Sequence, residues 1–198
     1  MFTRICLAIL TTLFSATLAC AAVTDTVKTT VDEVIRIVSD AEMKKKSNEQ
    51  RRRSAIKKSI ATIFDSQEMA KRSLGKHWNQ RTPAERKQFA ELFATLLENS
   101  YAGKIESYNN EKIIYTRESV DGDFAEVKSK VVTAKNDEYT LDYRLLKKEN
   151  GSWMVYDVVI EGVSLVSNYR TQFNKIISTS GYPELLKKLQ SKSNEIKM

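Results

Sequence analysis

The stretch KIIYTRESVDGDFAEVKSKVVTAKNDEYTLDYRLLKKENGSWMVYDVVI, residues 112–160, decides the fold because its apolar residues recur at alternate positions. It holds four segments of strand character, 112–119, 124–134, 139–148 and 152–160, which are separated by Asp-Gly, Asn-Asp and Asn-Gly turns. Connections this short join antiparallel neighbours. The stretch therefore predicts a four-stranded antiparallel meander.

The alternation also predicts that the sheet has one apolar face and one mostly wet face. In the third strand Leu141 and Tyr143 alternate with Asp142 and Arg144. The fourth strand, 152–160, is apolar at nearly every position, so we expect it to be the most buried strand of the sheet. Its parity does not show which of its side chains face the apolar side of the sheet.

Helical periodicity flanks the sheet on both sides. The tetrad Thr82-Pro83-Ala84-Glu85 combines a capping Thr, Pro at the first helical position and Glu three residues after the cap. Helices, then a meander, then helices indicate an α+β class in which all helices share the sheet's one apolar face. The predicted helices are 24–40, one that follows a loop within the basic stretch 42–58, 66–74 with a stop at Gly75, a long one from Thr82 to Tyr108, one from Val163 to the Gly181 stop, and one opened by Pro183.

Residues 1–21 are predicted to be a signal peptide. Arg4 is the only charged residue there, and the following apolar run is too short to span a bilayer. Ala19-Cys20-Ala21 suits a signal peptidase, although acylation of Cys20 in a lipoprotein is an alternative. The remaining chain, 22–198, is predicted to be one domain with a helical part at 24–109, the sheet at 112–160 and C-terminal helices at 163–195.

Composition narrows the chemistry of the exported chain. The 198 residues are 41% hydrophobic and carry 32 Lys and Arg against 25 Asp and Glu, which excludes disordered and fibrous classes. Both cysteines, Cys6 and Cys20, lie in or beside the leader, so cleavage leaves no disulfide and no thiolate nucleophile. Export also removes nucleic acid as the partner of the net positive charge.

Catalytic motifs are missing from the sequence. His77 is the only imidazole and is expected in a loop, and no G-x-S-x-G elbow, Walker loop, dinucleotide fingerprint or paired-histidine helix is present. We therefore expect no enzyme, no cofactor and no metal site. An acid–base enzyme that uses Asp142, Asp157 or Glu161 stays open as an alternative, with Asp157 as the named base.

The basic stretch 42–58 has eight Lys and Arg against two Glu. Most such runs are solvated helix faces. A functional interpretation is attraction to anionic lipid head groups or to an acidic protein.

The run VYDVVIEGVSLVSNYR, residues 155–170, resembles the signature of the MlaC family, also called the toluene-tolerance family. The similarity spans about 25–189. Upstream residues stand in the family's order and approximate spacing: Phe64-Asp65, Met69-Ala70, Leu74-Gly75, Trp78, Thr82-Pro83, Arg86, Phe89, Phe93 and Tyr101.

The resemblance implies a nuclear-transport-factor-2-like sheet with helices around a deep apolar pocket. It implies a periplasmic phospholipid shuttle that exchanges lipid with an inner-membrane ABC transporter bearing an MCE-type subunit and with an outer-membrane lipoprotein complex. Such a shuttle would maintain outer-membrane lipid asymmetry, and we expect it to be a monomer. A periplasmic enzyme or a non-lipid adaptor on the same fold are the alternatives.

The apolar stripes can close into a dense core or line a cavity, and sequence alone favours the core. Under the resemblance they become candidate walls of a lipid pocket. The sheet wall comprises Val131, Leu141, Tyr143, Val158 and Ile160; the helix wall comprises Phe89, Phe93, Leu97, Tyr101 and Ile105; the mouth or closing side comprises Trp78, Val163, Val166, Tyr169 and Phe173.

Overall fold

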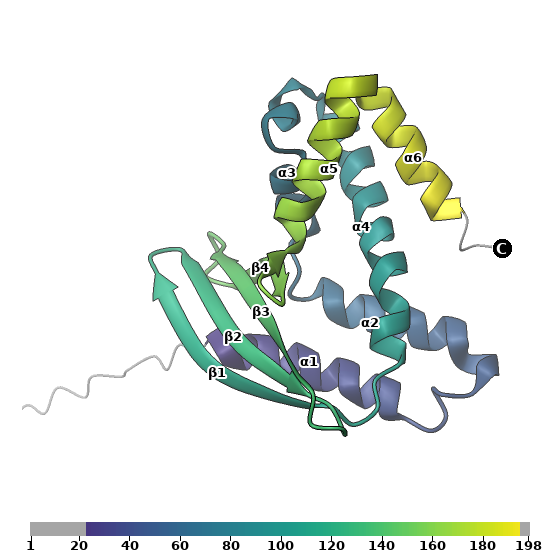
Figure 1. The fold of residues 1–198 in the computed structure, drawn as a ribbon, viewed down its shortest axis with the longest axis vertical. Helices are drawn as coiled ribbons and strands as arrows, with labels where there is room; N and C mark the ends of the chain where they lie inside the picture. Colours follow the sequence, from purple (N-terminus) through teal and green to yellow (C-terminus); the bar gives the residue numbers. More distant parts are fainter. Residues whose placement is uncertain (1–22, 195–198) are drawn as a thin grey trace, which may run out of the picture.

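The computed structural model describes residues 23–194, so the predicted signal peptide, its cleavage site and Cys20 lie outside the described residues. A group of helices stands at one end of a twisted sheet (Figure 1). Of two further helices, one runs along the sheet and the other lies below the group of helices. The elements are α1 (Val23–Ser39), the 3₁₀ helix η1 (Lys46–Asn48), α2 (Glu49–Ala61), α3 (Ser66–Leu74), the 3₁₀ helix η2 (Gly75–Gln80), α4 (Pro83–Glu106), β1 (Lys112–Asp121), β2 (Phe124–Val132), β3 (Glu138–Lys147), β4 (Trp153–Ile160), β5 (Val163–Ser164), α5 (Leu165–Ser180) and α6 (Tyr182–Asn194).

The sheet confirms the α+β class and the antiparallel meander, with the strand order β1-β2-β3-β4-β5. The prediction of four strands was one short. Glu161 and Gly162 adopt positive φ angles of 49° and 77°, and this turn folds Val163 back beside Ile160. Val163 was expected to begin a helix, but it lies in β5. A strand of two residues that pair across a turn leaves no periodic signal in the sequence.

A β-bulge explains why the apolar residues of the fourth strand follow no single parity. Leu145 pairs with Val155, whereas the preceding Arg144 pairs with Asp157, so Tyr156 is an extra residue in β4. An extra residue reverses the parity of everything after it. Residues of odd number before the bulge and of even number after it therefore face the same apolar side: Trp153, Val155, Val158 and Ile160.

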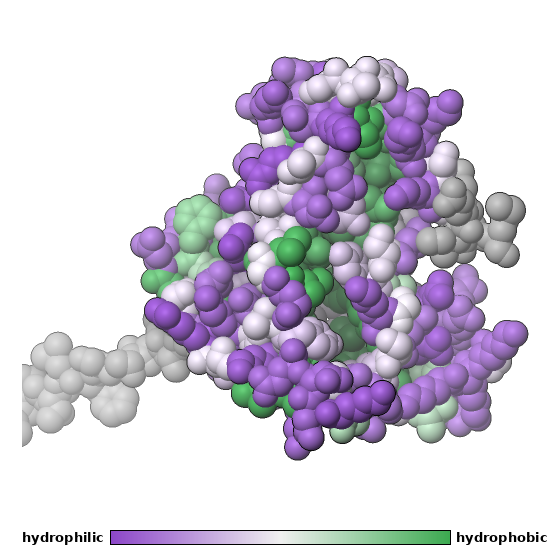
Figure 2. Space-filling view, viewed as in Figure 1, coloured by the Kyte–Doolittle hydropathy of each residue, from purple (hydrophilic) through white to green (hydrophobic). Residues whose placement is uncertain are grey.

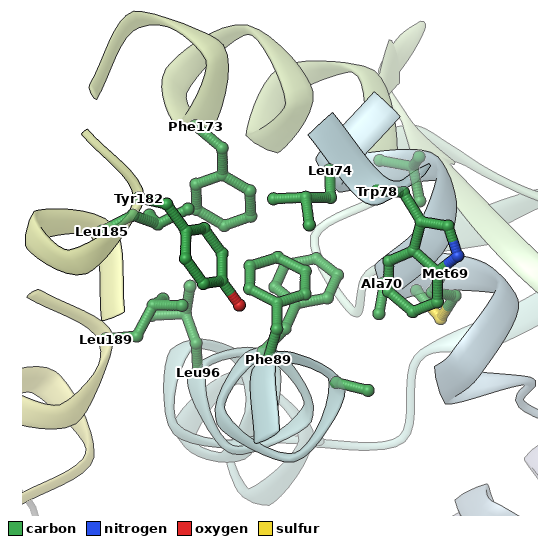
Figure 3. Packing of buried hydrophobic residues seen from close by; sticks show 13 residues of the cluster. Met69, Ala70, Leu74, Trp78, Phe89, Leu96, Phe173, Tyr182, Leu185 and Leu189 are labelled. Carbon is green, nitrogen blue, oxygen red and sulfur yellow. The ribbon is translucent and has the colours of Figure 1, made fainter. Parts of the chain in front are cut away.

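The helices do not all share the sheet's apolar face, which corrects the expectation from the sequence. Helix α1 lies on that face through Val23 and Val27, whereas α4 and α6 pack with α3 and α5. These four helices bury their stripes against one another, and Phe93 stacks at 5.9 Å from Phe89 and meets Phe173 edge-on at 5.5 Å between ring centroids. In Figure 3 the side chains of Phe89, Phe173, Leu74 and Leu185 point into this shared interior.

Local capping sets the start of the helices that carry the site. Thr82 and Glu85 form the predicted capping box, with Pro83 as the first residue of α4. Asp65 caps α3 by accepting a hydrogen bond from the Glu68 amide. None of the helices within residues 23–194 is long and apolar enough to cross a membrane.

The link between α2 and α3 is fastened to the sheet. The backbone amide of Val155 donates to the Ile63 carbonyl at 2.7 Å, and the Asp65 amide donates to the Val155 carbonyl at 2.8 Å. Phe64 thus forms a parallel bridge with β4. This short pairing places Phe64 between the helices and the sheet.

Candidate functional site

The interior is divided into three clusters of buried apolar side chains. The helical cluster lies among η2, α3, α4, α5 and α6, and the sheet cluster lies between α1 and the apolar face of the sheet. The base cluster consists of Ile37, Val38 and Ile56, where α1 meets α2. A single continuous core would have merged these three sets.

A hollow lies between the clusters. Figure 2 shows it with apolar side chains in its depth, bounded by β3 and β4, the C-terminal half of α4, and helices α1 and α2. Phe64 packs against both the helical and the sheet clusters, so the two meet at this residue. Half-buried apolar side chains border the clusters: Leu97 and Tyr169 at the helical one, Val31, Tyr115, Leu141, Ile160 and Leu165 at the sheet one, and Val34, Ile60, Ile105 and Tyr108 at the base one.

The C-terminal half of α4 borders this hollow and is fastened to α2. Helix α4 packs on α3 and α6 and is buried in the helical cluster from Phe89 to Leu96. Beyond these residues, Glu98 accepts from Lys57 at 2.8 Å, and Glu106, the last residue of α4, accepts from Arg52 at 3.1 Å and from Arg53 at 3.3 Å. The Arg52–Glu106 pair is largely shielded, with side chains 14% and 16% exposed. The ion pairs thus hold α4 on α2 while the space towards the sheet stays open.

Two phenols stand in the sheet cluster as neutral groups. Burial, with a smaller contribution from Asp32, raises the pKa of Tyr115 to about 12, and burial raises the pKa of Tyr143 as well. The Tyr115 hydroxyl is buried and has no hydrogen-bond partner within the described part of the chain. An unpaired buried hydroxyl is unfavourable, so an oxygen atom of a bound molecule would find a free partner here.

The predicted sheet residues come together in the structure. Tyr143 and Val158 are buried, and Leu141 and Ile160 are half-buried, all in the sheet cluster. Val131 is buried further along β2, where it pairs with Tyr139. Four of the five predicted side chains therefore share one apolar surface at the hollow's sheet side.

The predicted helix residues gather in a different place. Five of them are packed in the helical cluster with 9% exposure or less: Trp78, Phe89, Phe93, Val166 and Phe173. Leu97 and Tyr169 border that cluster, Ile105 borders the base cluster, and Tyr101 is half-buried on α4. Val163 is 55% exposed. The helix stripe thus splits along α4, with its first turns in the packed interior and its last turns at the hollow.

Several residues at the hollow were not among the candidates. Val31, Val34 and Ile60 lie on predicted helical stripes, so periodicity marked them as inward-facing without showing what they face. Phe64 lies just beyond the end of α2, and Leu165 is the first residue of α5. Only the three-dimensional path of the chain brings them to the hollow.

Both carboxylate oxygens of Asp157, the named candidate base, accept hydrogen bonds from neighbouring residues. Its Oδ2 accepts from Ser164 Oγ at 2.6 Å and from Arg144 Nη1 at 3.4 Å, and its Oδ1 accepts from the Val166 amide at 3.0 Å. It lies on the face opposite the sheet cluster and fastens the start of α5 to β4. His77 lies buried in η2 rather than in a loop, with Nε2 3.0 Å from the side-chain oxygen of Asn174.

Comparisons with known proteins agree with this architecture. The family model described as MlaC protein matches residues 28–191. The chain is 25% identical over 147 residues to the intermembrane phospholipid transport system binding protein MlaC of Haemophilus influenzae, covering 72% of this chain and 69% of that protein. It is 25% identical over 159 residues to toluene tolerance protein ttg2D of Pseudomonas putida, covering 79% and 74%.

A solved structure matches over nearly the whole chain. It is the phospholipid-binding protein from Ralstonia solanacearum in complex with a phospholipid, with a TM-score of 0.80 and 30% sequence identity. The match covers 90% of this chain and 100% of that one. A protein of similar fold has therefore been solved with a phospholipid bound.

Proposed function

Because the chain belongs to the MlaC protein family, we propose that it binds phospholipid in the hollow and carries it between membranes. The observation that supports this most directly is the apolar hollow between α4 and the sheet. The printed names of the relatives and the lipid-bound structure support the same ligand class.

The energetics of lipid transfer explain why a carrier is required. Each buried methylene contributes about 0.8 kcal/mol, so two acyl chains of roughly thirty methylenes represent on the order of 25 kcal/mol of exposure to water. A carrier must offer a site nearly as favourable as the bilayer, so that loading and unloading stay near balance. Such a task requires no reaction.

We assign the acyl chains to the half-buried side chains that surround the hollow. On α4 these are Leu97, Tyr101 and Ile105, and on the sheet they are Leu141 and Ile160. The buried aromatic residues of the helical cluster form the support behind them, since their rings already contact one another. The lipid head group stays at the solvent side of the hollow.

The location and partners of the chain follow from the same proposal. The predicted leader directs it to the periplasm, between the two membranes. We propose that it exchanges lipid with an inner-membrane ABC transporter bearing an MCE-type subunit and with an outer-membrane lipoprotein complex, and so maintains lipid asymmetry. The name of the Haemophilus relative, an intermembrane phospholipid transport system binding protein, supports this placement.

Native mass spectrometry of the freshly purified mature chain tests the ligand. We expect adducts with phospholipid masses that persist through gentle desalting and disappear after extraction with organic solvent. A clean unliganded mass, together with no uptake from fluorescent-phospholipid vesicles, would contradict the proposal. Transfer from loaded to empty vesicles measures carriage itself.

A further inference from the structure

A second concavity lies on the other side of the sheet from the sheet cluster. Arg144 and Asp157 line it, and both alternate with residues of the apolar face, Tyr143 and Val158. Its volume is about 440 Å³, and α3, η2 and the start of α5 form its walls. We call this concavity and its extension along the sheet the polar groove.

Positive charge prevails in this first concavity. Its cations are Lys71, Arg72, Arg144 and Arg170, and its acids are Glu68 and Asp157. Both carboxylates already form ion pairs with cations of the same concavity. Glu68 pairs with Lys71 at 3.3 Å and Arg72 at 2.8 Å, and Asp157 pairs with Arg144 at 3.4 Å.

Arg170 is the cation that takes no part in these ion pairs. Its one side-chain hydrogen bond is to Ser167 Oγ at 2.9 Å, and no carboxylate within residues 23–194 forms an ion pair with it. Its side-chain stem lies against Gly75, where an added Cβ would come within 3.2 Å of Arg170 Cδ. Gly75 therefore makes room for an arginine whose charge remains available in the groove.

The polar groove continues along the sheet into a second concavity of about 210 Å³, which shares Arg144 and Tyr156 with the first. This end combines exposed apolar side chains with Asp121 and Glu126, and Glu126 pairs with Arg144 at 3.5 Å. At this end Phe124 and Val120 are 48% and 52% exposed. The Arg72 guanidinium lies 3.9 Å from the ring centroid of Tyr156 and joins the charged part to the aromatic part.

We propose that the polar groove docks a segment of a partner protein that carries carboxylates beside a large apolar side chain. The carboxylates pair with Arg170 and with Lys71, which shares the single Glu68 carboxylate with Arg72, and the apolar side chain covers Phe124 and Val120. This charge complementarity guides association and selects against basic partners. The proposal does not depend on the cargo, because the groove and the hollow lie on opposite faces of the sheet.

A labelled acidic peptide tests the proposal on the intact mature protein. The probe is a fluorescein-labelled heptapeptide that alternates aspartate with leucine, with blocked termini, and its binding is followed by fluorescence anisotropy. The double variant Lys71→Met and Arg170→Met keeps the apolar stems and should weaken binding about tenfold, because it removes two exposed ion pairs with the probe. Phe124→Ser should weaken binding as well.

Matched variants separate docking from general charge attraction. The double variant Arg51→Met and Lys58→Met removes two exposed charges from α2 and should bind the probe like the wild type. Lys71→Glu with Arg170→Glu should lose the aspartate probe and gain a lysine–leucine probe. Retention of this charge-swapped binding shows that the variant is folded.

Four results would overturn the docking site. These are a wild type that does not bind the probe, equal weakening by the α2 control, equal binding of an aspartate–serine probe, and full competition by millimolar inorganic phosphate. The last two would mean that the groove takes small anions only. Native mass spectra of the same variants report cargo separately, so a failure of docking is distinguishable from a failure of lipid binding.

Discussion

Lys148, at the turn between β3 and β4, places its ammonium 2.7 Å from the carboxylate of Asp65, the residue that caps α3. The two residues are 83 positions apart in the chain. Asp65 also accepts the Glu68 amide at 2.9 Å. One carboxylate therefore joins the helices to the sheet at the point where Phe64 enters the hollow.

This pair makes stability depend on acidity. Burial of Asp65 acts most strongly and would raise its pKa, but the hydrogen bonds from Lys148 and the Glu68 amide outweigh it and lower the pKa. A lowered folded-state pKa stabilises the protein above the unfolded value of about 3.9, and this stabilisation is lost as the pH falls through the folded value. Asp65→Asn keeps a capping acceptor and loses the ion pair, which is worth up to about 1 kcal/mol at neutral pH.

Urea unfolding of both proteins from neutral to acid pH measures this contribution. The wild type should be the more stable at pH 7, and the two curves should converge below about pH 4. A difference that stays constant with pH would mean that Asp65 acts only as a cap.

Leu141→Asp tests the sheet side of the hollow. A carboxylate at this half-buried position has to be desolvated against acyl chains, so we expect co-purifying lipid to disappear while the protein remains folded. Ile114→Asp is the control, since Ile114 is a large apolar residue of the same sheet that is 48% exposed. Normal lipid content in a folded Leu141→Asp protein would refute the assignment. Circular dichroism and native mass spectrometry provide the two readouts.

Phe93→Ala tests whether the first half of α4 belongs to the packed interior. Phe93 is 1% exposed and contacts Phe89, Tyr169 and Phe173. Its truncation should cost about 3–5 kcal/mol of unfolding free energy. The loss should be the same before and after lipid extraction. A loss seen only in the lipid-bound protein would place Phe93 in the lipid wall instead.

Glu106→Gln tests the fastening of α4 to α2. It removes the shared partner of Arg52 and Arg53, at a cost of about 1–3 kcal/mol for hydrogen bonds to a charged group. We expect faster amide exchange in α2 and a faster release of lipid to acceptor vesicles. Glu98→Gln is the milder control, because Lys57 is 64% exposed. Equal exchange and release in both variants would argue against a role of the Glu106 ion pairs in holding α4 on α2.

Much of the fold follows from local sequence signals. The cap at Thr82, the stop at Gly75 and the period-two pattern of residues 112–160 act over a few residues, and the corresponding elements appear close to their predicted bounds. Such signals depend on backbone geometry that nearby side chains determine. They identify helices and strands without showing how these elements pack together.

The arrangement of the site could not be predicted in the same way. Nothing local distinguishes Phe93 from Leu97, which lie one turn apart on the same stripe, yet the first is packed and the second borders the hollow. The difference arises because Leu96 is the last residue of α4 that is buried in the helical cluster, and Leu97 packs at the edge of that cluster. Likewise, the hydrogen bond from the Val166 amide to Asp157 depends on the turn that forms β5. That turn is a product of tertiary pairing.

The extra residue Tyr156 has a consequence for length variation. Deleting it would restore strict alternation in β4 and would leave Val158 and Ile160 on the apolar side and Asp157 on the opposite side. Deleting Val159 instead would turn Ile160 to the opposite side. For this segment the loss of one residue is therefore tolerated best at the bulge, where every remaining side chain keeps its own face.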